Sequence, residues 1–223
     1  MSTGNRSHTR DEVAAAALEL VDDVGLDGLS MRRLAQRLGI GTMTLYGHFR
    51  SKEELLHALV ETAAGTTPPP DAGGDWQDRL RTIAWRWRRG LERHPAIVEV
   101  RLRKPILTPN ALKGTEAGLQ ALLDAGFDPA QAARGFRTLF LYVFGYVTFS
   151  DPDPGPPTRA AIDAAVAPLD PAEFPVVAAS APHLAATMGG DEQFADGLEL
   201  ILTGLAERAR GSDPSLQSVK RGV

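Results

Sequence analysis

The sequence predicts an all-α protein built from two helical domains. Apolar residues recur every three to four positions over most of the chain, and no alternating strand pattern of useful length occurs. Capping residues or prolines stand where several of these apolar stretches begin. Hydrophobic residues make up 43% of the 223 residues, which is enough to form packed cores.

The first two helices are marked at both ends. Thr9 and Glu12 have the spacing of a capping box, and Gly25 is a residue type that often ends helices, so one helix is expected between them. Ser30 is a good N-cap for a shorter second helix, which Gly39 would end.

A glycine-containing turn separates the second helix from a third. The turn is Gly39–Gly41, and the third helix is expected over Thr42–Phe49. Ser51 and Glu54 have the spacing of another capping box, which predicts a fourth helix after them. Thr66–Asp75 is rich in Thr, Pro, Gly and Asp and predicts a domain boundary.

The second part of the chain again has a helical pattern. One helix is expected to end near His94, because the residue before Pro95 disfavours the α conformation. A capping residue followed by proline predicts three further helices, which start at Pro109, Pro129 and Pro171.

The remaining segments complete the predicted domain organisation. Asp151–Pro157 is too rich in proline to be helical and predicts a loop. The last helix is expected over Asp191–Arg210. We therefore expect a helix-turn-helix domain over residues 1–66, a larger helical domain over 67–211 and a flexible tail over 212–223.

The composition indicates a cytoplasmic protein without a membrane span. Cysteine is absent, which excludes disulfides and thiolate metal sites and fits a reducing compartment. The N-terminus lacks the apolar stretch of a signal peptide. The longest apolar run, Leu139–Phe149, is too short to cross a bilayer.

One segment of this acidic chain carries basic residues and no acidic ones. The net charge is −4, yet the segment from Gly28 to Lys52 holds five basic residues and no acid. Such a segment suits a face that binds the phosphates of DNA. An ordinary solvated surface explains the charge alone equally well.

The two short helices between residues 30 and 49 favour DNA binding. They bury little surface by themselves and need the first helix as support. In a helix-turn-helix the second helix enters the major groove, where Thr and His can bond base edges or phosphates and Met can contact thymine methyl groups. An ordinary three-helix subdomain has the same general pattern.

This segment resembles the TetR family of transcriptional regulators, and within it the branch of the tetracycline repressors. The resemblance lies in Leu34–Ile40 (LAQRLGI), Thr44–Phe49 (TLYGHF), Lys52 and the pair Leu55 and Leu56. It is strong over the N-terminal domain and continues more loosely through the C-terminal part.

The resemblance implies a set of DNA contacts. The implied contacts are Thr42, Met43 and Thr44 in the groove, Tyr46, His48 and Lys52 on phosphates, and Arg32 on a base. Leu45 and Phe49 would belong to the core instead. Gly47 stands where close relatives carry a large side chain, so the operator sequence of those relatives is not expected to apply.

The apolar residues of the C-terminal part predict a homodimer. Residues 129–150 are apolar nearly all round, and the apolar stripe of the last helix needs cover as well, so packing across a two-fold axis would satisfy both. The resemblance implies the same arrangement, and a monomer with two central helices is the alternative. The expected interface comprises Phe136, Leu139, Val143, Val147, Phe194, Leu198, Ile201, Leu202 and Leu205.

A small-molecule effector is expected in the C-terminal domain, as the resemblance implies. The candidates for its pocket are Trp85, His94, Arg101, Phe140, Tyr142, Phe144, Tyr146 and His183. Tyr142 and Tyr146 lie one turn apart, so their hydroxyls either line a cavity or face the dimer partner. His94 can also simply end a helix.

No metal, other cofactor or catalytic site is expected. Tetracycline repressors bind a drug–magnesium complex through a histidine after their sixth helix, and Ile97–Leu112 contains no histidine. Sequence motifs of metalloproteases, phosphate loops and nucleophile elbows are absent, which argues against an enzyme. We expect a repressor that binds a palindromic operator as a homodimer and that a small molecule releases. A DNA-binding protein without an effector is the alternative.

Overall fold

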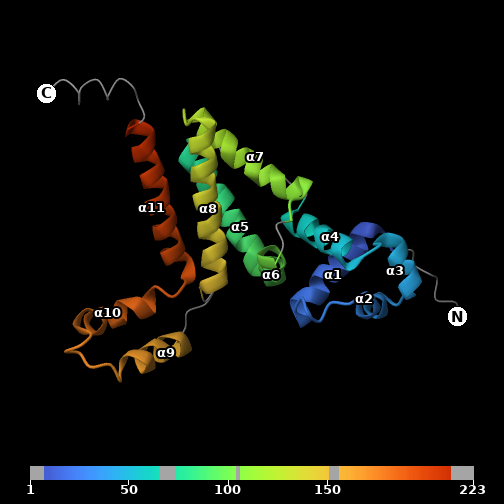
Figure 1. Cartoon of the computed structure of the whole chain (residues 1–223), viewed down its shortest axis with the longest axis horizontal. Coiled ribbons are helices and arrows are strands. Elements are labelled where there is room, and N and C mark those ends of the chain that lie inside the picture. Colours follow the sequence, from blue (N-terminus) through green and yellow to red (C-terminus); the bar gives the residue numbers. More distant parts are fainter. Residues whose placement is uncertain (1–7, 66–73, 104–105, 151–155, 212–223) are drawn as a thin grey trace. The chain divides into compact units, whose positions relative to one another are not determined.

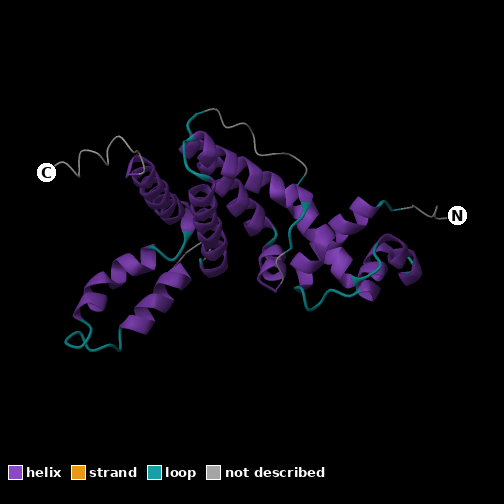
Figure 2. Cartoon of the chain, turned by 45° about the horizontal axis from the view of Figure 1, so that its top comes forward, coloured by secondary structure: helices purple, strands orange, loops and turns teal. Residues whose placement is uncertain are grey.

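The computed structural model describes residues 8–65, 74–103, 106–150 and 156–211. Within these ranges the chain forms eleven helices and no strand (Figure 1, Figure 2), which confirms the predicted all-α fold class. The helices are α1 (Arg10–Val24), α2 (Met31–Leu38), α3 (Thr42–His48), α4 (Lys52–Ala64), α5 (Trp76–Arg93), α6 (Pro95–Arg103), α7 (Pro109–Asp124), α8 (Pro129–Phe149), α9 (Pro156–Val166), α10 (Pro175–Ala186) and α11 (Gly190–Gly211).

The chain divides into two compact units. The first comprises residues 1–72 and 85–118, and the second comprises residues 73–84 and 119–223. Helices α5 and α7 each begin in one unit and end in the other. Besides the four N-terminal helices, the first unit therefore contains α6 and the adjoining parts of α5 and α7.

The capping residues of α1 and α2 act as the sequence predicts. Thr9 Oγ1 accepts a hydrogen bond from the Glu12 N–H (3.2 Å), and the Glu12 carboxylate accepts one from the Thr9 N–H (2.7 Å), so the capping box is complete. Ser30 caps α2 through its hydroxyl. Gly39 ends α2 in the left-handed conformation, with φ of +66°, which favours glycine.

The capping box predicted at the start of α4 is only half formed. Ser51 Oγ accepts a hydrogen bond from the Glu54 N–H at 3.1 Å, as predicted. The Glu54 carboxylate instead accepts a bond from the Arg50 N–H (2.8 Å) and pairs with the Arg10 guanidinium (2.7 Å). The other predicted bond of the box, from the Ser51 N–H to the Glu54 carboxylate, was wrong, because Arg50 and Arg10 bind that carboxylate instead.

A small apolar core holds the N-terminal helices together. Helix α1 packs against α4, and α2 packs against α3. The fully buried side chains of this core include Val13, Ala17, Leu34, Leu45, Phe49, Leu55 and Leu59.

Helix α6 covers α1 and α4 within the same unit. Its buried residues include Ile97, Val98 and Val100. The sequence pattern does not reveal this helix, because β-branched residues have lower helix propensity and the segment is short. Burial against two neighbouring helices compensates for that weak propensity.

Helices α7 and α8 begin at the prolines that the sequence indicated. Pro109 and Pro129 each occupy the first helical position. Asp128 caps α8, and its carboxylate accepts a hydrogen bond from the Gln131 N–H (2.8 Å) in a complete capping box.

The second unit has a core between α8 and α11, which pack against each other. Five side chains from these two helices have at most 1% of their surface exposed: Leu139, Val143, Phe194, Leu198 and Leu202. Gly135 permits close contact in this core, because a Cβ there would lie 2.9 Å from Leu205 Cδ2.

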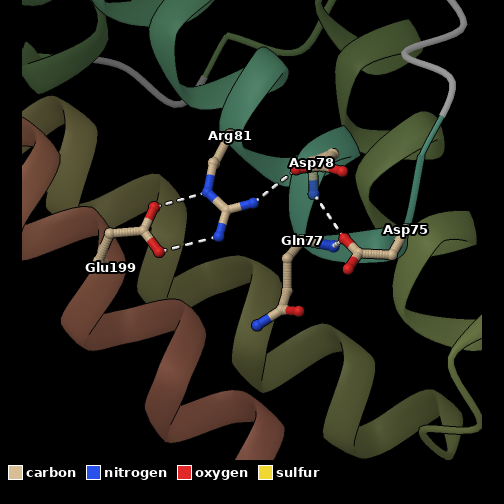
Figure 3. A network of polar contacts seen from close by, with 5 residues as sticks. All are labelled: Asp75, Gln77, Asp78, Arg81 and Glu199. Carbon is tan, nitrogen blue, oxygen red and sulfur yellow. Dashed lines mark hydrogen bonds and ion pairs between the residues drawn. The ribbon is translucent and has the colours of Figure 1, made fainter.

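Charged side chains fix the first turns of α5 in the second unit (Figure 3). The Asp75 carboxylate accepts hydrogen bonds from the Gln77 N–H (2.9 Å) and the Asp78 N–H (3.0 Å). Arg81 donates to both carboxylate oxygens of Glu199 in α11 (2.5 and 2.9 Å) and to Asp78 (2.7 Å). This bidentate pair lowers the pKa of Glu199 and links α5 to α11.

Two predictions between residues 151 and 175 were wrong. Helix α9 begins at Pro156, inside the predicted loop, because the first turn of a helix tolerates proline. No helix begins at Pro171, because the Asp170 carboxylate and carbonyl hold the following residues in a single turn, and α10 begins at Pro175. Helices α9 and α10 pack against each other.

Parts of the predicted linkers fall outside the described residues: 66–73 of the domain boundary, 151–155 of the loop and 212–223 of the tail. Among the helices that are described, none has the length and apolar character needed to cross a bilayer.

Candidate nucleic-acid interface

Two buried side chains anchor helix α3, and most of its other residues face solvent. Leu45 within the helix and Phe49 directly after it are fully buried, as the resemblance implied. Leu34 of α2, the helix that packs against α3, is fully buried as well. The turn at Gly39–Gly41 and these buried side chains thus fix the direction in which the other residues of α3 point.

The exposed side of α3 is made of small, apolar and aromatic residues. Met43 is 83% exposed and Tyr46 is 43% exposed, and Thr44 is exposed as well. A Cβ at Gly47 would meet no atom within 4 Å, so the backbone of the helix is open there. The first and last residues of α3, both predicted DNA contacts, are partly buried.

Lys52 is bound to the turn between α1 and α2. Its Nζ donates to the carbonyls of Leu29 (2.9 Å) and Leu26 (3.4 Å). The resemblance implies a DNA phosphate as the partner of this ammonium. The sequence carries no local signal for the two carbonyls, because the turn lies more than twenty residues earlier in the chain. Its contact with DNA stays a prediction.

The basic residues around α3 differ in how far their charge is neutralised. Arg37 pairs with Asp23 (2.6 Å) and Glu19 (3.5 Å) on α1, and the hydrogen bond to Asp23 is the main cause that raises the pKa of Arg37. Arg32 and Arg50 are exposed, and no acid in the described part of the chain lies within ion-pair distance of either. Within the described residues these two side chains therefore offer positive charge outside any ion pair, although Arg50 also interacts electrostatically with the Glu54 carboxylate.

Three polar contacts connect the N-terminal helices to α5, α6 and α7 within the first unit. They are His94 Nδ1 with Asp22 Oδ2 (2.7 Å), Arg103 with Asp27 (3.0 Å), and the Asn110 N–H with the Glu61 carboxylate (2.9 Å). The Arg103 guanidinium also lowers the pKa of Asp27. The position of α6 is thereby linked to the end of α1 and to the turn that Lys52 holds.

The residues predicted to line an effector pocket divide between the two units. Trp85, His94 and Arg101 belong to the first, and Phe140, Tyr142, Phe144, Tyr146 and His183 belong to the second. His183 is exposed, whereas the other seven are partly buried. Their role in binding an effector stays a prediction.

The two tyrosine hydroxyls have an intramolecular role. Tyr142 donates to the Phe194 carbonyl (2.8 Å), and Tyr146 donates to the Gly190 carbonyl (2.6 Å). Both rings also lie against the Phe194 ring, with centroids 5.4 and 5.1 Å away. These hydroxyls therefore hold α8 to the first turns of α11, an arrangement that neither sequence alternative included.

Most residues predicted at the dimer interface are buried in their own chain. Leu139, Val143, Phe194, Leu198 and Leu202 have at most 1% of their surface exposed, and Phe136 and Leu205 have 7% and 6%. These seven have little surface left to bury against a second copy, and their place in a dimer interface stays a prediction. Val147 and Ile201 remain partly exposed.

Other apolar residues of α8 and α11 are exposed, and the predicted interface did not include them. Leu141 is 53% exposed, Phe149 is 85% exposed and Leu200 is 76% exposed. The helical period was the available signal, since these residues lie on other faces than the buried set. Gly145 and Gly204, each four residues after one of these leucines, have open space where a Cβ would stand.

Two family models match the chain. Residues 13–59 match the model described as bacterial regulatory proteins, tetR family, and residues 68–209 match the model described as tetracyclin repressor-like, C-terminal domain. Together the two matches cover most of the described helices.

Individual relatives and solved structures agree with these matches. The chain is 31% identical over 214 residues to the tetracycline repressor protein class C of Escherichia coli, covering 95% of this chain and 96% of that protein. It is 35% identical over 139 residues to the HTH-type transcriptional repressor DrrR1 of Streptomyces coeruleorubidus, covering 61% of this chain and about half (52%) of that protein. The structure of ActR from Streptomyces coelicolor in complex with actinorhodin is similar with a TM-score of 0.79 and 26% identity, covering 93% of this chain and 98% of that chain.

Proposed function

The chain belongs to the TetR family of bacterial regulatory proteins, and on this premise we propose that it represses transcription as a homodimer on a palindromic operator until a small molecule releases it. As a member of this family it is a DNA-binding transcriptional regulator and not an enzyme. The proposal concerns its assembly, its operator and its effector.

The observation that carries the proposal is the exposed face of α3. Two buried anchors fix this helix, while Met43, Thr44 and Tyr46 remain exposed for a DNA groove. In the proposed contact set Arg32 reads a base, and Arg50 supplies positive charge for phosphates. Thr42, His48 and Lys52 complete the proposed contact set, with Lys52 also holding the α1–α2 turn. DNA is the partner, so we place the protein in the cytoplasm.

The exposed apolar residues of α8 and α11 support a homodimer. Leu141, Phe149 and Leu200 would lie in the interface, together with the partly exposed Val147 and Ile201. A two-fold axis would set two α3 helices a fixed distance apart, so that each binds one half of a palindrome.

A small organic effector is proposed for the C-terminal helices. ActR, a similar structure, was solved with actinorhodin bound, and the partly buried aromatic residues of α8 in this chain suit an apolar ligand. Release requires that the effector favour a DNA-incompetent state by only a few kcal/mol. The contacts of Asp22 with His94 and of Asp27 with Arg103 would connect α6 to the DNA-binding helices.

The proposal is tested by selecting duplexes from random-sequence DNA with the purified protein. We expect a palindromic sequence, with an affinity that falls steeply as salt rises. Tyr46→Ala should abolish binding to that duplex and leave the protein folded, because the ring is substantially exposed. His57→Ala, on the exposed side of α4, is the control and should bind normally. Unchanged affinity of Tyr46→Ala would contradict the assignment of α3 to the groove.

A further inference from the structure

We infer that α3 recognises thymine through its 5-methyl group and that Met43 is the contacting residue. This inference rests on the proposed function and assigns a base preference to the proposed DNA-binding helix.

The composition of α3 leaves little scope for hydrogen-bonded recognition of bases. Its sequence is TMTLYGH, which contains no Arg, Lys, Asn or Gln. Those are the side chains that bond guanine or adenine through two hydrogen bonds, and Asp or Glu, which accept from cytosine, are absent too. Discrimination by this helix must therefore come from single hydroxyl or imidazole contacts and from apolar contact with the thymine methyl group.

Met43 is placed to make that apolar contact. Its side chain is 83% exposed, whereas that of Tyr46 on the same helix is 43% exposed. Methionine is unbranched and polarisable, so it can adapt to a methyl group on a base edge. Burial of both groups would remove apolar surface from water.

Gly47 makes room beside Met43. The two residues lie four positions apart in the helix and so share one face. A Cβ at Gly47 would meet no atom within 4 Å among the described residues, so the helix backbone is open at this point. A base-pair edge can therefore approach the helix backbone next to the Met43 side chain.

The size of the effect follows from one methyl group. Burial of a methyl-sized group contributes about 0.8 kcal/mol, which corresponds to about a fourfold change in affinity for each contact. A fourfold change is well within the resolution of a titration by fluorescence anisotropy.

The test uses the duplex selected above, with each thymine replaced in turn by deoxyuridine. Deoxyuridine lacks the methyl group and keeps the hydrogen-bonding edge of thymine. For the wild-type protein we expect about fourfold weaker binding at one or more positions in each half-site. Met43→Ala should bind the unmodified duplex more weakly and should lose the sensitivity at those same positions. Val176→Ala, at an exposed valine of α10 (76% exposed), is the control and should keep the wild-type pattern.

Two results would overturn the inference while leaving the proposed function intact. One is a wild-type protein that binds the selected duplex but is insensitive to every thymine replacement. The other is a sensitivity that persists unchanged in Met43→Ala, with its fold verified by circular dichroism. A wild-type protein that selects no duplex at all would instead overturn the proposed function itself.

Discussion

Around α3, single residues differ in how much they contribute to the stability of the DNA-binding helices and to their affinity for DNA. Gly47 lowers the helix propensity of α3, yet nothing in the structure occupies the space next to it. Lys52 is positively charged, yet its ammonium is held by two carbonyls of the protein. Substitution of each residue should therefore move stability and DNA binding to different extents.

Gly47→Ala should stabilise the protein and weaken its binding to DNA. The added methyl group raises helix propensity by up to about 1 kcal/mol without a clash, but it projects from the open backbone toward the duplex. Thermal unfolding and anisotropy titration measure the two effects. Gly90→Ala in α5, where a Cβ also meets nothing within 4 Å, should stabilise the protein and leave DNA affinity unchanged. A Gly47→Ala protein with full affinity would show that the duplex does not approach this part of α3.

Lys52→Met should lower the free energy of unfolding by about 1 kcal/mol, because the carbonyls of Leu26 and Leu29 lose a charged donor. Urea titration provides the measurement.

Arg50→Ala is the comparison variant, because it removes an exposed charge. It should leave the free energy of unfolding within about 0.5 kcal/mol of wild type. It should also reduce the salt dependence of DNA binding by about one phosphate contact. Equal loss of stability in both variants would argue against the turn contact of Lys52.

At the scale of elements, α8 and α11 each have one buried side and one side with exposed apolar residues. The buried sides form the core of the second unit, and the exposed sides carry Leu141, Phe149 and Leu200. An exposed apolar surface of this kind on two neighbouring helices is typical of a protein interface.

Leu200→Glu should convert the proposed homodimer into monomers, because a charge would be buried at the proposed two-fold interface without a partner. Analytical ultracentrifugation at micromolar concentration measures the change. Val176→Glu is a closely matched control, since Val176 in α10 has the same exposed fraction as Leu200, 76%. If Leu200→Glu remained dimeric while Val176→Glu dissociated, the interface would lie on α10 instead.

Local signals predicted most helix ends correctly. Thr9, Ser30, Gly39 and Asp128 act through contacts with residues at most a few positions away, so the sequence alone contains the information. The buried role of Leu45 could also be predicted, since helical spacing and the family resemblance agree.

Features that depend on distant segments could not be predicted in the same way. Helix α6 forms because α1 and α4 cover it, and Lys52 binds carbonyls of an earlier turn. The apolar character of α8 indicated that two sides need cover, but only the packing shows that Leu139 and Val143 face α11 of the same chain. The sequence pattern predicts which residues are buried, but the residues that pack against them are known only from the structure.

At the scale of the whole molecule, arginine–carboxylate pairs tie together segments far apart in the chain. Arg79 pairs with Asp124, Arg81 with Glu199 and Arg103 with Asp27. Each of the three carboxyls has a pKa below its ordinary value, chiefly because of a hydrogen bond from the arginine. The pairs therefore stabilise the folded chain above the ordinary carboxyl pKa and are lost as the pH falls through the lowered values.

Glu199→Gln should make the protein less sensitive to acid. In the wild type the carboxylate of Glu199, whose ordinary pKa is 4.5, pairs with Arg81 at pH 7 and is progressively protonated in acid. The side chain is half exposed, so its contribution should stay below about 1 kcal/mol. The measurement compares urea unfolding at pH 7 and pH 3. Glu207→Gln, which alters a pair within α11 alone, should keep the full acid sensitivity, and an equal effect of both variants would argue against the α5–α11 pair.

The cover that α6 gives to α1 and α4 restricts how this protein can be divided. A fragment that stops at residue 66 would lack α6 and would leave the faces that pack on Ile97, Val98 and Val100 in water. The first unit is discontinuous in sequence, so no single cut releases it whole. A fusion of helices α1–α4 to the ligand-binding domain of another protein must therefore supply a substitute for α6 or include residues 85–118 as well.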